Sequence, residues 1–219
     1  MRRPASKVAN GGLVAYRKLK AKEIVDQANR RENPLPLRRT DELPILDNVP
    51  LTVECCYPKS CSPELLDDML NVLYNNMKGF YDQSSWEWDT EKKREEAFSS
   101  KSRLLICRVA DTEFPTSTAV AGFVSFRFER EVDRPVLYCY EIQLREQYRG
   151  RSIGCYLMNL LFLIAKDCKM DRVMLTVFKF NERALRFFRA LGFVKDETDP
   201  SNFKGNPKVD YIIMSKSVM

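Results

Sequence analysis

The segment from residue 136 to residue 178 constrains the fold more than any other part of the sequence. A run rich in Tyr and β-branched residues, Val136–Leu144, enters a polar loop, which is followed by an apolar helical stretch, Ile153–Lys169, and by the run Arg172–Phe178. A strand, a helix and a strand in this order predict a right-handed unit with two parallel strands. The last run reads RVMLTVF, which is typical of a strand buried on both faces. This segment therefore predicts an α/β fold.

The remaining apolar runs predict further elements around this unit. Further strands are expected at Leu51–Tyr57, Arg103–Ala110, Ala119–Glu129, Phe193–Lys195 and Val209–Ser215. Further helices are expected at 13–31, from Ser62-Pro63-Glu64 to a stop at Gly79, from Asp89 or Thr90 to Phe98, and from a cap at Asn181 to Ala190. Together these elements predict a mixed central sheet of about seven strands with helices on both faces.

The length of 219 residues suits one domain with an N-terminal extension, because single domains usually run ~100–200 residues. We expect a disordered basic tail at 1–12, a helix and a Pro-rich connector at 13–50, and the folded domain at 51–219. Apolar residues of the N-terminal helix fall within one arc that is expected to pack on the core: Leu13, Val14, Ala21, Ile24, Val25 and Ala28.

The positive charge of the chain is concentrated in this extension. Residues 1–31 hold nine Lys and Arg against two Asp and Glu, a net +7, whereas the whole chain carries +6, so residues 32–219 sum to −1. Two interpretations fit this distribution. The extension either serves nuclear import or attraction to nucleic acid, or it is simply a solvated tail and helix face.

The absence of His from the sequence excludes several kinds of site. Ser-His-Asp and Cys-His catalysis and every His-ligated metal site are ruled out, so acid–base chemistry must use Glu, Asp, Tyr, Cys, Lys or water. Seven Cys without a Cys-x-x-Cys pair indicate reduced thiols in an intracellular protein, and we expect no metal. No apolar run approaches the ~18 residues of a membrane span and no secretory signal is visible, so no membrane association is expected.

The polar loop before residue 153 offers the chemistry of a phosphate cradle. Arg149-Gly150-Arg151-Ser152-Ile153-Gly154 combines small residues, positive charge and the free backbone N–H groups of a helix start. It is neither a Walker loop nor a Gly-x-Gly-x-x-Gly dinucleotide motif. An ordinary basic loop remains the alternative on these grounds.

The order of elements and two motifs resemble the GCN5-related N-acetyltransferase superfamily. Its acetyl-CoA loop has the form Gln/Arg-x-x-Gly-x-Gly/Ala, which Arg149 and Gly154 match, with Ser152 in place of the middle Gly. Because Ser is small and caps helices well, we expect pyrophosphate binding to persist. A second motif, Asn-x-x-Ala followed by two aromatic residues, is matched by Asn181, Ala184, Phe187 and Phe188. Many relatives have a Tyr acid at the position of Phe188.

Four segments resemble the histone-specific N-terminal acetyltransferases of the NatD type: Tyr81–Trp88, Lys93–Glu96, Leu137–Glu141 and Val173–Lys179. The resemblance covers residues 13–215. It implies transfer of acetyl from acetyl-CoA to the α-amine of histone tails beginning Ser-Gly-Arg-Gly. We accordingly expect a monomer of the nucleus and cytoplasm that binds histone tails and no specific nucleic acid.

The resemblance also implies which residues hold the donor. The backbone of a strand next to the opening of the sheet is expected to pair with the pantetheine arm, at Ile142, Gln143 and Leu144. The remaining cofactor residues are expected to be Arg149, Gly150, Arg151, Ser152, Ile153, Gly154, Cys155, Asn181 and Phe188.

Glu141 is the expected general base. An α-amine has a pKa of ~7.7–8, against ~10.4 for Lys, so a carboxylate acting directly or through one water is strong enough. Tyr138 and Tyr140 are expected to orient water or to donate a proton to the departing thiolate. Simple alternation places Glu141 on the opposite face of the strand from both tyrosines, and a β-bulge would bring the three together.

The peptide mouth is expected to be lined by aromatic residues: Tyr81, Trp86, Tyr138, Tyr140 and Tyr211. By resemblance, Glu129 pairs with the substrate Arg and Thr176 bonds the peptide backbone. Without the resemblance, such aromatic residues would more often belong to a core. Two other functions stay open: acetylation of Lys side chains, and a catalytically silent module that binds acetyl-CoA or chromatin.

Overall fold

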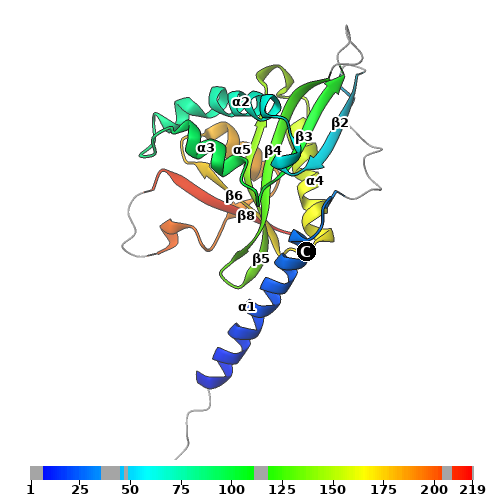
Figure 1. Cartoon of the computed structure of the whole chain (residues 1–219). Coiled ribbons are helices and arrows are strands. Elements are labelled where there is room, and N and C mark those ends of the chain that lie inside the picture. Colours follow the sequence, from blue (N-terminus) through cyan, green and yellow to red (C-terminus); the bar gives the residue numbers. More distant parts are fainter. Residues whose placement is uncertain (1–6, 36–44, 47–48, 111–117, 204–208, 219) are drawn as a thin grey trace, which may run out of the picture.

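The computed structural model describes residues 7–35, 45–46, 49–110, 118–203 and 209–218. These residues form one mixed sheet with helices packed on both of its faces (Figure 1). The predicted α/β fold is therefore confirmed.

The sheet has eight strands in the order β1-β2-β3-β4-β5-β6-β8-β7 among the described residues. Their bounds are Ile45–Leu46, Val49–Cys56, Arg103–Ala110, Thr118–Glu131, Arg134–Leu144, Arg172–Phe178, Val194–Lys195 and Tyr211–Ser217 for β1 to β8. Every neighbouring pair is antiparallel except β5 and β6, which are parallel. The parallel unit predicted from residues 136–178 is confirmed.

Five α-helices cover this sheet in the described chain: α1 Lys7–Asn29, α2 Pro63–Tyr81, α3 Thr90–Ala97, α4 Ile153–Asp167 and α5 Glu182–Ala190. Side-chain caps start three of them, because Ser62, Asp89 and Asn181 each accept a hydrogen bond from a backbone N–H of the first turn. The expected stop of α2 at Gly79 is wrong. Gly79 lies within the helix, which continues to Tyr81.

Two hydrophobic clusters lie on opposite faces of the sheet. The α2 and α3 face buries Met69, Leu70, Val72, Leu73, Ala97, Leu104, Ile106, Val120 and Phe123. The other face carries the larger cluster, to which α1, α4 and α5 contribute. Alternate residues of β3 enter opposite clusters, as the period of two of a strand requires, whereas in β4 the alternation is reset at the register shift between Val120 and Gly122.

Helix α1 differs from its prediction at both ends. It begins at Lys7, so residues 7–12, expected to be disordered, are helical, and residues 1–6 lie outside the described part. Only its C-terminal part docks: Ala21, Val25 and Ala28 are buried, whereas Val14 is 44% exposed. The N-terminal part projects away from the body of the protein (Figure 1). The apolar arc was therefore predicted too long.

The end of α1 is attached to the sheet by a buried cation. The guanidinium of Arg103 on β3 is 1% exposed and donates hydrogen bonds to the carbonyl oxygens of Asn29 and Arg31, each at 2.9 Å. It also donates to the hydroxyl of Tyr57 at 2.6 Å. A cation at the C-terminal carbonyls complements the helix dipole and satisfies groups that lack intrahelical partners.

The sheet opens where β5 and β6 diverge. The two strands pair only over Val136–Cys139 and Arg172–Leu175. Beyond this ladder β5 continues along β4, and β6 continues along β8. The predicted splay of the sheet is confirmed, and it leaves the backbone of β5 from Tyr140 onward facing the opening.

Candidate active site

A β-bulge at Tyr140 brings the expected catalytic residues to one side of the sheet. Glu141 lies opposite Ser125 and Cys139 lies opposite Phe126, so Tyr140 is an extra residue in β5. The extra residue resets the alternation, and Glu141 joins Tyr138 and Tyr140 on the α2 and α3 face. The bulge that the sequence only allowed as a possibility is therefore present.

Each of the three side chains is held by a specific partner. The hydroxyl of Tyr138 lies 2.6 Å from that of Thr176 on β6, which links the two sides of the opening. The hydroxyl of Tyr140 donates to Glu129 at 2.9 Å. Glu141 accepts a hydrogen bond of 2.9 Å from the side chain of Gln143.

The environment of Glu141 suits a base that works near neutral pH. Burial raises the pKa of its carboxyl to about 7, against the opposing effects of the nearby Lys93 ammonium and the hydrogen bond from Gln143. Glu96 adds to the rise. A base with a pKa near the working pH combines a useful ionised fraction with proton affinity.

Lys93 was not foreseen as a site residue. It extends from α3, forms an ion pair with Glu96 and lies 4.6 Å from the centre of the Tyr81 ring. Burial opposes its charge, but Glu141 and Glu96 more than compensate and raise the pKa of Lys93 above its ordinary value. Lys93 is therefore a cation beside the base.

The two tyrosines are neutral phenols at physiological pH. Burial raises the pKa of Tyr138 to about 12, and burial together with Glu129 raises that of Tyr140 further. Their hydroxyls can thus donate hydrogen bonds but not act as bases. The thiol of Cys139 is also neutral, because burial raises its pKa.

Glu129 lies in the site but already has partners. Besides accepting from Tyr140, it lies 3.9 Å from the guanidinium of Arg127, which stacks over the Tyr140 ring at 4.0 Å. A substrate cation at Glu129 would therefore approach a carboxylate that is partly neutralised by Arg127.

An aromatic wall forms the mouth of the site. The rings of Trp86 and Tyr211 lie 5.0 Å apart, and those of Tyr81 and Trp86 lie 6.3 Å apart. Sequence reasoning missed two further members, Phe178 and Phe180, whose rings stack at 5.1 Å. They follow Thr176 on and after β6, so the period of that strand could have indicated Phe178.

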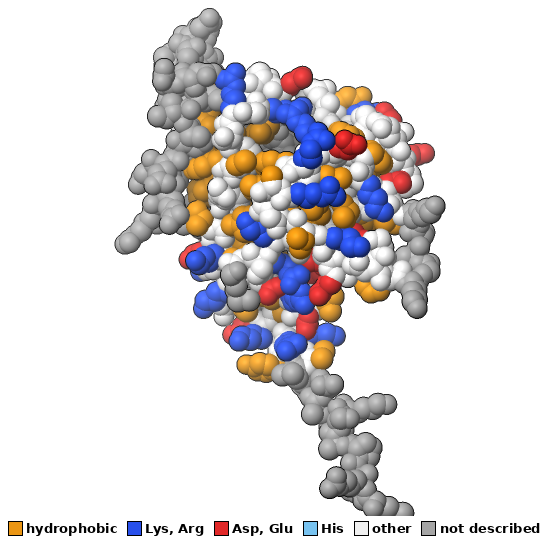
Figure 2. All heavy atoms as spheres, turned by 180° about the vertical axis from the view of Figure 1, so that it is seen from behind, with side chains coloured by type: hydrophobic (Ala, Val, Ile, Leu, Met, Phe, Trp, Pro, Cys, Tyr) orange, Lys and Arg blue, Asp and Glu red, His pale blue; other side chains and the backbone are white. Residues whose placement is uncertain are grey.

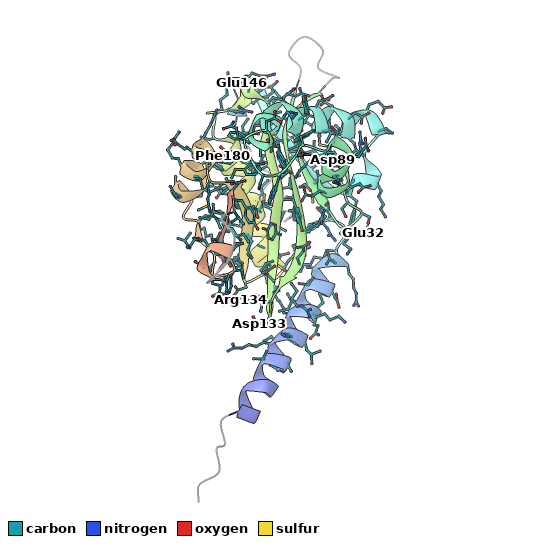
Figure 3. All side chains as sticks on the ribbon, turned by 90° about the vertical axis from the view of Figure 1, so that its left-hand side faces the viewer. Glu32, Asp89, Asp133, Arg134, Glu146 and Phe180 are labelled. Carbon is teal, nitrogen blue, oxygen red and sulfur yellow. The ribbon has the colours of Figure 1, made fainter. Side chains whose placement is uncertain are left out.

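A cavity of about 670 Å³ lies beside this wall, between the end of α2 and α3. It is lined by Tyr81, Trp86, Glu87, Trp88, Asp89, Lys92, Lys93 and Glu96. In Figure 3, Asp89 marks the start of α3 and Phe180 the loop after β6. The lining combines aromatic faces with three carboxylates and two ammonium groups, which suits a peptide rather than an apolar ligand.

The loop before α4 turns sharply at two residues with positive φ. Gly150 has φ 75° and Ser152 has φ 62°, the left-handed region. Ser152 precedes α4, but its hydroxyl makes no capping hydrogen bond to the described first turn, contrary to the expectation that it caps. The first N–H groups of α4 therefore lack a side-chain acceptor and are available to an anionic ligand.

Gly154 is needed for close packing of α4 on α5. A Cβ atom at this position would come within 3.3 Å of the Phe187 ring. Asn181 uses its side chain to cap α5, accepting from the Ala184 N–H at 3.1 Å. Phe188 is only 6% exposed and packs against Phe187 and Phe193, so it contributes to the core behind the loop.

The surroundings of the loop are basic. Arg151 in the loop and Arg183 on α5 are exposed, whereas Arg186 on α5 is paired with Glu182. Figure 2, a view from behind, shows Lys and Arg side chains spread over this side of the molecule. Burial and the neighbouring Arg183 lower the pKa of Arg149. Charge of this sign favours a polyanion such as a pyrophosphate.

Arg149 itself points back toward the sheet. Its guanidinium donates to the side chain of Asn76 on α2 and, at 3.2 Å, to the carbonyl of Leu144. Asn76 also donates to Gln143 at 2.9 Å. Sequence reasoning included Gln143 only for its backbone and missed Asn76, because no local pattern joins residues that lie 67 positions apart.

Comparison with known proteins shows to which family this chain belongs. The model of the acetyltransferase (GNAT) family matches residues 68–193, which is more than half of the chain. The chain belongs to the GNAT acetyltransferase family. The GNAT match includes the bulged strand, the loop before α4 and helix α5.

A curated relative is similar over a shorter stretch. The chain is 34% identical over 91 residues to N-alpha-acetyltransferase 40 of Saccharomyces cerevisiae. The alignment covers 38% of this chain and 32% of the relative, so it spans about a third of that protein.

Solved GNAT structures share the fold at low identity. The PaiA N-acetyltransferase of Thermoplasma acidophilum, solved with coenzyme A, has a TM-score of 0.52 and 20% identity and covers 76% of this chain and 99% of its own. Arabidopsis thaliana NAA60, solved with a bisubstrate analogue, has a TM-score of 0.52, 14% identity and the same coverage.

The residues of the GNAT site fit acetyl-CoA. The uncapped start of α4 and the basic side chains near it suit a pyrophosphate, and Gly154 lets α4 begin close to Phe187 of α5. The backbone of Ile142 and Gln143 borders the opening along which an extended arm would pair, whereas the carbonyl of Leu144 already accepts from Asn76 and Arg149. Among the described residues, no group of three or more Cys, Asp or Glu side chains is arranged to hold a metal ion. No described helix is long and apolar enough to cross a membrane.

Proposed function

We propose that this GNAT protein acetylates the α-amine of protein N-termini, with histone tails beginning Ser-Gly-Arg-Gly as its substrates. The observation that carries the proposal is the position of Glu141, with a pKa of about 7, beside two neutral phenols at the opening of the sheet. An α-amine with a pKa of ~7.7–8 is matched to such a base. Similarity to N-alpha-acetyltransferase 40 supports this choice of acceptor.

The residues of the site divide the work of the transfer. Acetyl-CoA, when bound, supplies a thioester carbonyl that an amine can attack, so that a C–N bond forms as the C–S bond breaks. Glu141 accepts the proton that the amine loses, directly or through one water. Tyr138 donates a hydrogen bond to the leaving sulfur while Thr176 donates to Tyr138, or Tyr140 does so after releasing Glu129. The buried Phe188 cannot fill this role.

Direct attack by the amine is favoured over an acetyl-cysteine route. Cys139 is 3% exposed, its burial raises the pKa of the thiol, and the sequence has no His to deprotonate it. The thiolate is the nucleophilic form of Cys, so this residue is a packing residue.

The mouth of the site supports a basic, extended peptide. Trp86, Tyr81 and Tyr211 offer flat apolar surfaces for small residues, and Thr176 can bond the peptide backbone. We propose that Glu129 receives the Arg of the tail, in competition with Arg127, which lies 3.9 Å from it. We further propose that the protein acts as a monomer in the nucleus and cytoplasm, where new and assembled histones are found.

Incubation with acetyl-CoA and two peptides tests the proposal. One peptide begins with a free Ser-Gly-Arg-Gly end, and the other has the same sequence with a blocked α-amine and a free Lys. Acetyl on the first peptide alone is the expected result. Acetyl on the second alone would replace the proposal with Lys acetylation, and a failure of both would indicate a silent binding module.

A further inference from the structure

Glu141 is one end of a chain of hydrogen bonds that runs through three other side chains. Gln143 Nε2 donates to Glu141 Oε2 at 2.9 Å. Asn76 Nδ2, on α2, donates to Gln143 Oε1 at 2.9 Å. Arg149 Nη2, in the loop before α4, donates to Asn76 Oδ1. The chain therefore connects the base on β5 with the loop that is expected to hold the pyrophosphate.

In each of these three hydrogen bonds, the donor lies on the Arg149 side and the acceptor on the Glu141 side. A guanidinium can only donate, so Asn76 must present its oxygen to Arg149 and its NH₂ group to Gln143. Gln143 must then accept with its oxygen and donate with its own NH₂ group, which faces Glu141. Asn76 Nδ2 also donates to the carbonyl of Leu144 at 3.0 Å, which holds the amide in this orientation.

We propose that Asn76 and Gln143 are positioning residues that keep Glu141 ionised and correctly oriented, and that Arg149 sets the direction of the chain from the cofactor loop. This inference rests on the proposed function, in which Glu141 is the base. The bond from Gln143 stabilises the carboxylate and occupies one of its oxygens, leaving the other for the proton of the amine. Without Asn76, the amide of Gln143 could turn its oxygen toward Glu141 and favour the protonated acid.

The other titratable groups around Glu141 come from three elements. Lys93 and Glu96 face it from α3 and Tyr81 from α2, while Cys139 of its own strand lies on the opposite face of the sheet. Of these groups, only Lys93 favours the ionised form of Glu141, and the burial of Glu141 opposes that form. Because the group titrates near neutral pH, losing one hydrogen bond changes the ionised fraction where the enzyme works.

Two substitutions change the order of donors and acceptors in the hydrogen-bond chain while nearly preserving the size of the side chain. Asn76→Asp keeps the size and an oxygen for Arg149 but has no NH₂ group, so Gln143 must turn its own NH₂ group toward the new carboxylate. Gln143→Met keeps the length of the side chain and removes the donor. Asn75→Ala is the matched control, since Asn75 is an exposed neighbour on the same helix.

The test measures the dependence of kcat/KM for the acceptor amine on pH, from about pH 5.5 to about pH 9. We expect the acid limb to move up by about one pH unit or more in Asn76→Asp and Gln143→Met, because a hydrogen bond to a charged group is worth ~1.5–3 kcal/mol. The rates should approach that of the parent at high pH, and Asn75→Ala should follow the parent throughout. Melting temperatures verify that each variant is folded.

Two results would overturn the inference. One is a loss of rate by the same factor at every pH, which would indicate a purely structural role, and the other is an acid limb that does not move in either folded variant. If the parent acetylates a different amine, that amine serves in the same test. If the parent transfers no acetyl group, the proposed function fails, and NMR titration of ¹³C-labelled Glu carboxyls then decides. An unchanged pKa of Glu141 in Asn76→Asp would reject the chain.

Discussion

At the scale of single residues, Glu141 is expected to determine the rate of acetyl transfer and its dependence on pH. Glu141→Gln preserves shape and removes the proton acceptor, so kcat should fall by roughly 10²–10⁴ with little change in peptide affinity. The loss should shrink at high pH, because the α-amine then deprotonates without help. Steady-state kinetics from acid to alkaline pH provide the measurement. If Glu141→Gln keeps near-parental rates at neutral pH while Tyr138→Phe or Tyr140→Phe is inactive, Glu141 is not the base and a phenol moves the proton.

Gly154 permits the second prediction at this scale. Gly154→Glu places a side chain and a negative charge at the start of α4, where a Cβ atom would already meet Phe187. We expect calorimetry to show binding of acetyl-CoA weakened by about tenfold or more. Gly79→Glu is the matched control, because nothing lies within 4 Å of its Cβ position on α2. Equal affinity in both variants would contradict the assignment of the loop.

At the scale of elements, α1 combines a docked and a projecting part. Deleting residues 1–20 should leave the melting temperature unchanged, because the described side chains removed from this part are exposed. Deleting 1–31 removes the buried Ala21, Val25 and Ala28 and the carbonyl partners of Arg103. This longer deletion should lower the melting temperature by ~5 °C or more. Differential scanning calorimetry on the two truncations checks this. A similar fall after the shorter deletion would show that the projecting part stabilises the fold.

The elements also show how far the sequence predicts this molecule. The bounds of β3 and β6 were predicted correctly, since β-branched apolar runs between polar residues leave little choice. The length of the docked part of α1 could not be predicted, because it depends on where the sheet ends. The capping state of Ser152 depends on a loop conformation. The contact of Asn76 with Gln143 and Arg149 depends on tertiary packing alone.

At the scale of the whole molecule, Glu141 should reduce stability in alkaline solution. Its pKa is raised in the folded protein above the ordinary value of ~4.3, so between these values the folded state binds more protons than the unfolded state. Its contribution to the free energy of unfolding is therefore lost as the pH rises from about 4 to about 7. Glu141→Gln should be more stable than the parent at pH ~8, on the order of 3–4 kcal/mol, and nearly equal to it at pH ~4. Urea unfolding at both pH values measures the difference, and a gap that is larger in acid would contradict the assigned shift.

The divergence of β5 from β6 creates a strand edge inside the molecule. An edge strand on the outside of a protein invites pairing with other chains and with it aggregation. Here the unpaired backbone lies between the two halves of one sheet, with α3 and α4 on either side, so a neighbouring folded protein cannot reach it. Only a slender, extended chain can enter. Under the proposed function this slender chain is the pantetheine arm, so the gap that leaves β5 unpaired is reserved for the donor.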